Sequence, residues 1–168
     1  IAEKKDIELA LEACKRMGNN DLALLKCTSS YPAPINEANI RMIKDLSERY
    51  NVITGLSDHT LGTTVPVVAT CFGAKIIEKH FILDRSIGGP DSSFSLDEKE
   101  FTKMVKNVRE AESAIGKVEY NLTKKQVKGK DFSRSLYVVK DIKKGELFTE
   151  KNIRSIRPGF GLHPKYYK

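Results

Sequence analysis

VITGLSDH at residues 52–59 and AKIIEKH at residues 74–80 are the two stretches that decide the fold of this chain. Each is a short apolar run that closes on a histidine. Residues 61–73 between them have the length of one helix and its turns, so the pattern predicts a strand–helix–strand unit. Parallel neighbouring strands lie about 5 Å apart, and active sites of α/β sheets gather at the carboxyl ends of the strands. The two imidazoles can therefore converge on one ion there.

Further elements follow on both sides of this unit. The apolar periods predict a strand at Leu22–Thr28. They also predict four helices, at Ile7–Met17, Asn36–Tyr50, Val65–Phe72 and Leu96–Gly116. Thr63 or Thr64 is expected to cap the helix between the histidines, and Asn36 the one before it. Strands alternating with helices predict an α/β fold with a parallel sheet. Three such units are too few for a closed eight-stranded barrel, but they suit its second half.

The pattern changes after residue 116. We expect one domain over residues 1–116, a linker over 117–133 with no apolar period, and a small β-rich module over 134–168. Within the module, the apolar runs Ser135–Val139, Leu147–Phe148 and Ile153–Ile156 predict β structure. The chain starts without Met and ends without a closing element, so we expect both ends to be cut from a longer protein.

Composition excludes several classes of protein. No apolar run approaches the roughly 20 residues that span a bilayer, and no signal peptide is visible, so a cytoplasmic location is expected. Residues 117–168 hold 14 basic and 5 acidic residues, but no nucleic-acid-binding motif accompanies them. A solvated surface, or one facing an anionic substrate, is favoured. Three widely spaced cysteines indicate reduced thiols; a catalytic thiol at Cys27 has no base beside it in sequence.

Side chains alternate across a strand. Ser57 and His59 therefore share one face, and so do Glu78 and His80. Lys26 lies two residues before Thr28 in the preceding strand. We expect Lys26 and Glu78 to line the mouth of a barrel and to compensate each other's charge or that of bound ions. For each histidine alone, a hydrogen-bonding cap of its strand is the alternative to metal binding.

Five motifs in order resemble the sialic acid synthase family. They are KCTSSYPAP at residues 26–34, GLSDHT at 55–60, IEKHF at 77–81, GGPD at 88–91 and VVKDIKKGELFTEKNIRSIRPGFG at 138–161. The last resembles the start of that family's antifreeze-like (SAF) domain. Tyr31 after a double serine, and Ser133-Arg134-Ser135 after Phe132, resemble the pseudaminic acid synthase subgroup. The resemblance implies the C-terminal part of a TIM (β/α)8 barrel followed by a small β-rich SAF domain.

The resemblance also implies a reaction. Such enzymes condense phosphoenolpyruvate with an N-acetylated amino-sugar aldehyde and make a nine-carbon 2-keto acid and phosphate. They require a divalent metal, Mn²⁺ or Mg²⁺, for which His59 and His80 would be the ligands. The N-terminal barrel half is missing, so we expect no synthase activity from this chain by itself. N-acetylneuraminate or legionaminate synthesis is the nearest alternative, and a non-catalytic carbohydrate-binding module is an alternative of another class.

The resemblance assigns roles to further residues. Thr28, Ser29 and Ser57 would bind phosphoenolpyruvate, and Tyr31 and Asp91 the amino sugar. Glu78 and Asp91 are the candidate catalytic carboxylates. In the C-terminal part, Phe132 would pack on the acetamido group, and Arg157 would enter the active site of a partner, which implies a domain-swapped homodimer. Without the resemblance, a turn aspartate, a docked linker phenylalanine and a surface arginine would explain Asp91, Phe132 and Arg157.

Overall fold

The computed structural model describes residues 2–167, which fall into two compact units that meet between Lys117 and Val118. The first unit is an α/β fold, as predicted. In chain order its elements are α1 (Lys4–Arg16), β1 (Ala23–Cys27), η1 (Ile35–Glu37), α2 (Arg41–Tyr50), β2 (Ile53–Asp58), α3 (Thr64–Cys71), β3 (Ile76–Lys79), η2 (Arg85–Ile87) and α4 (Glu98–Ile115). None of the helices over residues 2–167 is long and apolar enough to cross a membrane.

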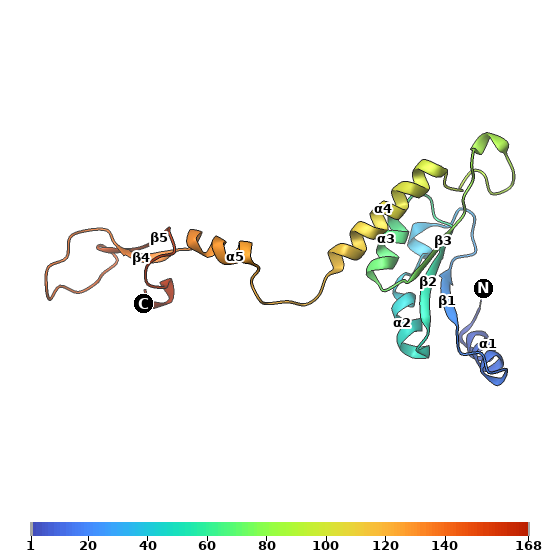
Figure 1. Cartoon of the computed structure of the whole chain (residues 1–168), viewed down its shortest axis with the longest axis horizontal. Helices are drawn as coiled ribbons and strands as arrows, with labels where there is room; N and C mark the ends of the chain where they lie inside the picture. The colour runs from blue at the N-terminus through green and yellow to red at the C-terminus, as the bar shows by residue number, and fades with distance from the viewer. Residues whose placement is uncertain (1, 168) are drawn as a thin grey trace. The chain divides into compact units, whose positions relative to one another are not determined.

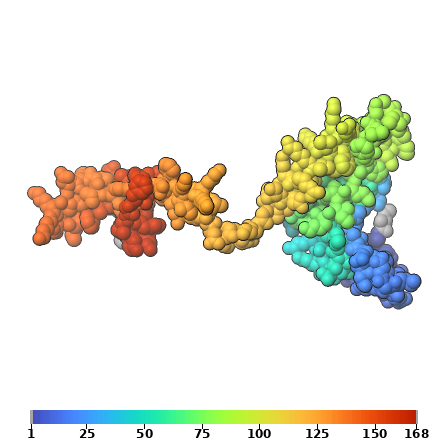
Figure 2. Space-filling model, in the orientation of Figure 1, coloured from blue at the N-terminus to red at the C-terminus, as the bar shows by residue number. Residues whose placement is uncertain are grey.

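Three parallel strands in the order β1-β2-β3 form the sheet of this unit (Figure 1). Its core lies between the sheet and helices α2 and α3. Ile43 of α2, Leu56 of β2 and Ala69 of α3 are buried there with almost no exposed surface. Helix α4 packs on α3, as the green and yellow segments show (Figures 1 and 2). Even-numbered residues of β2 therefore face the helices, and odd-numbered ones face the opposite side.

The helix predicted from Asn36 to Tyr50 is divided in the structure. Asn36 lies inside the short helix η1 and caps nothing, while α2 begins only at Arg41. Asn39 between them has φ +46°, a left-handed conformation that asparagine tolerates and that interrupts a helix. The interruption is local, because Ile43 and Leu46 still give α2 its buried stripe.

Helix α4 starts with a reciprocal cap. Asp97 Oδ1 accepts from the backbone N–H of Glu100 at 2.9 Å, and Glu100 Oε2 accepts from that of Asp97 at 3.1 Å. We predicted that the helix opens at Leu96, which instead lies beside the sheet in a parallel bridge with Phe81. The cap thus marks the turn from the sheet into the helix.

Removing this cap has a predictable effect. Asp97→Ala is expected to lower the free energy of unfolding by about 1 kcal/mol, because the backbone N–H of Glu100 loses its partner side chain. Asp97→Asn retains an acceptor oxygen and is expected to keep most of the stability. The exposed neighbour Glu98→Ala should change the value by less than about 0.5 kcal/mol. Urea unfolding followed by circular dichroism measures all three, and equal losses in Asp97→Ala and Glu98→Ala would contradict the assignment.

The second unit is small and β-containing. Its elements are α5 (Lys124–Gly129), η3 (Lys130–Phe132), β4 (Ser135–Val138), β5 (Ile153–Ile156) and η4 (Pro164–Tyr166). β4 and β5 pair antiparallel. Two expectations differ from the structure. Residues 124–132, expected to be part of a linker, form helical turns. Leu147 and Phe148, expected to form β structure, are largely exposed and belong to no strand.

Candidate active site at the carboxyl end of the sheet

The parallel register brings three polar side chains into one row. Cys27 of β1 aligns with Ser57 of β2, and Ser57 aligns with Glu78 of β3. All three lie on the face of the sheet away from α2 and α3. Ser57 Oγ donates to Glu78 Oε1 at 2.7 Å, so the hydroxyl orients the carboxylate. The prediction that Glu78 does not point toward the outer helices is therefore confirmed.

Lys26 lies on the other face of the sheet, in register with Leu56. Its Nζ donates to Thr28 Oγ1 at 3.0 Å and to the carbonyl of Cys27 at 2.8 Å. Burial lowers the pKa of this ammonium. The expected mutual compensation of Lys26 and Glu78 is wrong, because the sheet separates them.

His59 and His80 follow the ends of β2 and β3, and their ring centroids lie 5.1 Å apart. His59 is buried and His80 is partly exposed. The convergence predicted from the two strand ends is therefore present. Each ring also has an oxygen beside Nδ1. The carbonyl oxygen of Thr28 lies 2.9 Å from His59 Nδ1, and Asp91 Oδ2 lies 3.4 Å from His80 Nδ1.

The Thr28 carbonyl determines which ring nitrogen of His59 is free. A carbonyl oxygen can only accept, so Nδ1 of His59 carries the hydrogen and Nε2 keeps its lone pair in the neutral ring. At His80, the 3.4 Å approach of Asp91 Oδ2 to Nδ1 is an electrostatic contact. This arrangement is typical of histidines that bind a metal through Nε2. Among residues 2–167, no group of three His, Cys, Asp or Glu side chains is placed to hold a metal ion. The donor set fits a cation bound by two imidazoles, with its other positions open to oxygen ligands.

Cys27 lies beside the same imidazole. Its Sγ is 3.8 Å from His59 Nδ1 and 3.8 Å from Ser29 Oγ, and the residue is exposed. The base that the sequence did not reveal is thus nearby. However, the Nδ1 hydrogen of His59 is directed to the Thr28 carbonyl, so this nitrogen has no lone pair to accept the thiol proton. His59 Nδ1 therefore cannot serve as a base for this thiol.

Two aromatic side chains surround the histidines. Tyr31 lies 4.3 Å from His59 and 6.0 Å from His80 between ring centroids, and it is more than half exposed. Phe94, which is buried, lies 5.2 Å from His80 and 5.6 Å from Tyr31. The rings give the polar site an apolar wall, and the exposed Tyr31 forms its rim. Sequence reasoning missed Phe94, which lies in an irregular segment without periodicity.

The remaining predicted residues of the first unit surround this centre. Thr28 supplies the carbonyl for His59, and its hydroxyl donates to the carbonyl of Glu37 at 3.2 Å. Ser29 is exposed at the strand end. Asp91 is about half exposed and has His80 as its neighbour. Seven predicted residues thus gather at one edge of the sheet with Tyr31: Thr28, Ser29, Ser57, His59, Glu78, His80 and Asp91.

A buried ion pair behind the histidines was not predicted. Lys79 Nζ lies 2.6 Å from Asp58 Oδ2, and each side chain is only 1 % exposed. These residues directly precede His80 and His59 on the helix-facing side of the strands. Alternation places them on that side, but a polar residue in a mostly apolar strand gives no sign of its partner.

The segments that carry Phe132 and Arg157 are joined by a backbone hydrogen bond within the second unit. The N–H of Gly159 donates to the carbonyl of Asp131 at 2.9 Å, which joins the loop after Arg157 to the turn before Phe132. A Cβ at Gly159 would lie 2.4 Å from the carbonyl oxygen of Lys130, so this close approach requires glycine. Phe132 and Arg157 are both exposed.

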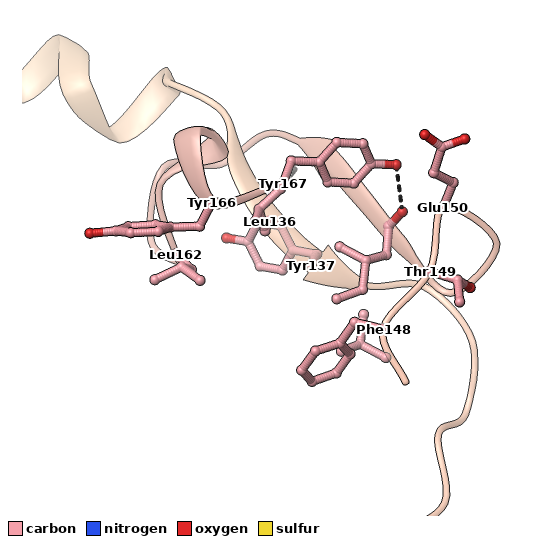
Figure 3. Close-up of a pocket in the computed structure, with 10 residues that line it drawn as sticks. Leu136, Tyr137, Phe148, Thr149, Glu150, Leu162, Tyr166 and Tyr167 are labelled. Carbon is pink, nitrogen blue, oxygen red and sulfur yellow. Dashed lines mark hydrogen bonds between the residues drawn. The ribbon is translucent and has the colours of Figure 1, made fainter. Parts of the chain in front are cut away.

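A cavity of about 390 Å³ also lies in the second unit, between the β4–β5 pair and the C-terminal turn (Figure 3). Its wall includes Tyr137, Phe148, Tyr166 and Tyr167, and Tyr167 Oη donates to the carbonyl of Ile153 at 3.2 Å. None of the residues that line it is one of the predicted site residues. The cavity wall contacts the loop that carries Arg157, because Tyr137 Oη donates to the carbonyl of Pro158 at 3.0 Å.

Comparisons with known proteins agree with this architecture. The NeuB family model matches residues 1–120, and the SAF domain model matches residues 133–168. The whole chain is 51% identical to pseudaminic acid synthase of Campylobacter jejuni subsp. jejuni serotype O:2, covering 49% of that protein. It is 46% identical to pseudaminic acid synthase of Helicobacter pylori, covering 50% of it. The chain thus spans about half the length of these curated relatives.

A solved structure shows the same fold. N-acetylneuraminic acid synthetase from Leptospira borgpetersenii serovar Hardjo-bovis matches with a TM-score of 0.69 and 32% identity, over 76% of this chain and 45% of that one. NeuB proteins are TIM-barrel enzymes, so the parallel sheet of the first unit is part of such a barrel, as expected, and a SAF domain follows it. The chain belongs to the NeuB family.

Proposed function

We propose that this chain supplies the C-terminal barrel part and the SAF domain of a pseudaminic acid synthase. The enzyme would condense phosphoenolpyruvate with 2,4-diacetamido-2,4,6-trideoxy-L-altrose and release phosphate. The main support is the pair of imidazoles at the carboxyl edge of the sheet, each with Nδ1 engaged by an oxygen. The 51% identity to a protein of that name over the whole chain supports the choice of sugar acid.

In this proposal, the Nε2 atoms of His59 and His80 hold Mn²⁺ or Mg²⁺. The cation supplies Lewis-acid polarisation of the aldehyde oxygen when it is bound. The Thr28 carbonyl would keep His59 in the required tautomer, and the Asp91 carboxylate lies 3.4 Å from Nδ1 of His80, on the side of the ring away from Nε2. The buried position of His59 excludes bulk water from one side of the site.

The other side chains bind and orient the reactants. Ser29 would donate to phosphoenolpyruvate, which carries only acceptor oxygens. Ser57 would do the same by turning its single hydroxyl hydrogen from Glu78 to the ligand. The carbon–carbon bond would form between pyruvyl C3 and the aldehyde carbon, whose oxygen would become an alkoxide and gain a proton. Water would add at C2, and Glu78, beside Ser57, would take one proton of that water at its carboxylate oxygen, which balances the proton gained by the alkoxide. The C2–O bond to phosphate would then break as C2 becomes a ketone, and the second water proton would leave with the phosphate. Tyr31 would lie against the sugar, with Asp91 at the rim.

Phe132 and Arg157 would complete the site of a second protomer. Both are exposed in the second unit, and the Gly159–Asp131 bond holds their loops together. An exposed phenyl ring suits the acetamido methyl group, and a guanidinium suits bidentate contact with carboxylate oxygens. The proposed assembly is a domain-swapped homodimer.

A chimera tests the proposal. These 168 residues replace the matched 168 residues of the Campylobacter jejuni synthase, so that the other half of the barrel is present. We expect the chimera to release phosphate from phosphoenolpyruvate only when the diacetamido sugar and Mn²⁺ are both added. The chain alone should release none, because the missing strands leave its site incomplete. A phosphate assay and mass spectrometry of the nine-carbon acid measure these outcomes.

The sugar specificity decides among the alternatives. Turnover of N-acetylmannosamine or of the legionaminate precursor in place of the altrose sugar would assign the chain to one of those neighbouring synthases. A folded chimera that binds the sugar but never releases phosphate would contradict the synthase proposal and support a carbohydrate-binding module. Robust turnover by the chain alone would contradict the expectation that the missing half is needed.

A further inference from the structure

The buried pair Asp58–Lys79 occupies a special place relative to the two histidines. Asp58 and Lys79 are register partners in the parallel β2–β3 ladder, and each directly precedes a histidine. Because side chains alternate across a strand, the pair lies on the helix-facing side of the sheet, opposite the row of Ser57 and Glu78. A single salt bridge thus joins the two strand ends from which the histidines emerge.

The pair also holds the residue after His59. Lys79 Nζ donates to the carbonyl of Thr60, and the backbone N–H of Thr60 donates to Asp58 Oδ1 at 2.9 Å. His59 therefore lies between Asp58, which is a member of the ion pair, and Thr60, whose backbone is bound by both members. Its own carbonyl accepts from the N–H of Ala33 at 2.8 Å. A shift of the His59 backbone would have to break one of these buried bonds.

Stability alone does not explain an ion pair at this depth. Removing two charges from water is costly, and buried ion pairs can often be replaced by apolar side chains without loss of stability. A salt bridge has a directional geometry that an apolar contact lacks. The atoms that this geometry fixes here are the backbone atoms on either side of His59 and the strand end before His80.

We propose, on the basis of the function proposed above, that Asp58 and Lys79 are positioning residues for the histidine pair. Neither touches the substrate or the cation. They hold the backbones of His59 and His80 at the separation that allows both imidazoles to serve one site. Loss of the pair would loosen the histidines while the helix-facing core, centred on Ile43 and Ala69, stays packed.

The test replaces both charges together. The Asp58→Leu/Lys79→Met double variant leaves no unpaired buried charge, so it is expected to fold. Two amides report the histidine backbones without contacting the pair: Ala33 N–H donates to the His59 carbonyl, and Leu96 N–H to the His80 carbonyl at 2.9 Å. In hydrogen exchange on the full chain, we expect both amides to lose protection at least tenfold, while the Ala74 amide, bonded to Ala69 in the core, keeps it.

The control removes a buried hydrogen bond elsewhere. Thr70→Val deletes the 3.0 Å bond from Thr70 Oγ1 to the carbonyl of Pro66 in α3 and preserves volume. It should leave the Ala33 and Leu96 amides unchanged. Unchanged protection of these amides in the double variant would overturn the inference, as would an equal loss in Thr70→Val. If the double variant does not fold, Lys79→Arg replaces it, because this change keeps the charge but moves the hydrogen-bond donors. Unchanged protection of the Ala33 and Leu96 amides in Lys79→Arg would overturn the inference.

Manganese titration separates this inference from the proposed function. By electron paramagnetic resonance, the double variant should bind Mn²⁺ at least tenfold more weakly than the unmodified chain. If the unmodified chain and the chimera bind no Mn²⁺, the metal site in the proposed function is wrong, and the exchange measurement still decides the positioning role. If Mn²⁺ affinity is the same in both chains, the pair does not position the histidines for a metal.

Discussion

Replacing either His59 or His80 by alanine in the chimera is expected to slow phosphate release by about 10³-fold or more. Among residues 2–167, two imidazoles lie at this edge of the sheet, and Nδ1 of His59 is hydrogen-bonded to the Thr28 carbonyl while Nδ1 of His80 faces Asp91. Loss of one ring removes one of these two imidazole donors. Polarisation of an aldehyde oxygen by a cation contributes several kcal/mol, and each 1.4 kcal/mol corresponds to a factor of ten in rate.

The third histidine provides the matched control. His163 lies in the second unit, where its Nδ1 accepts from the backbone N–H of Lys165 as a cap of a three-residue helix. His163→Ala is expected to leave turnover essentially unchanged. Circular dichroism must show that the His59→Ala and His80→Ala chimeras are folded. Turnover by a folded variant within tenfold of the parent would exclude a role for that histidine in holding a cation.

The meeting of the two histidines could be predicted because it depends on local rules. Alternation along a strand fixes which residues share a face, and the crossover helix makes the two strands parallel. Both rules can be read from residues 52–80 alone. The same rules place Ser57 and Glu78 on one face, where the structure shows their hydrogen bond.

The position of Lys26 could not be obtained in this way. Counting back from Thr28 gives the residues that share a face within one strand, but the face itself depends on the register with the neighbouring strand. Cys27, and not Lys26, aligns with Ser57. Packing against α2 and α3 sets that register through the buried Leu56, and no short stretch of sequence contains this information.

Irregular segments limited the prediction of the site wall. Phe94 lies in a turn region before the Asp97 cap, where neither a helical nor an alternating period exists. Asn39 interrupts a helix by adopting a left-handed conformation, which asparagine permits but does not require. Asp58 and Lys79 are polar residues in apolar strands, but pairing them requires the β2–β3 register, which only the structure supplies.

Gly55 is the position at which one methyl group should do the greatest harm to the sheet. It lies in the middle of β2, beside Leu25 and Ile76. A Cβ there would lie 2.4 Å from the carbonyl oxygen of Ile76 and 2.6 Å from Leu25 Cδ2. The leucine tip can rotate away, but the carbonyl belongs to the backbone of β3. Gly55→Ala must therefore push β3 away from β2.

We expect Gly55→Ala to lower the free energy of unfolding by about 3 kcal/mol, the upper part of the range for overpacking. Gly129→Ala makes the same chemical change where a Cβ meets nothing within 4 Å and φ is −64°. That variant should be stabilised by about 0.4–1 kcal/mol, because alanine restricts the unfolded chain. Urea unfolding of the chain measures both values.

Separation of β2 from β3 also moves Ser57 away from Glu78, so the Gly55→Ala chimera should lose turnover while it is still folded. A Gly55→Ala chain as stable as the unmodified one would show that β3 can shift freely, and the rigid histidine spacing argued above would then be wrong.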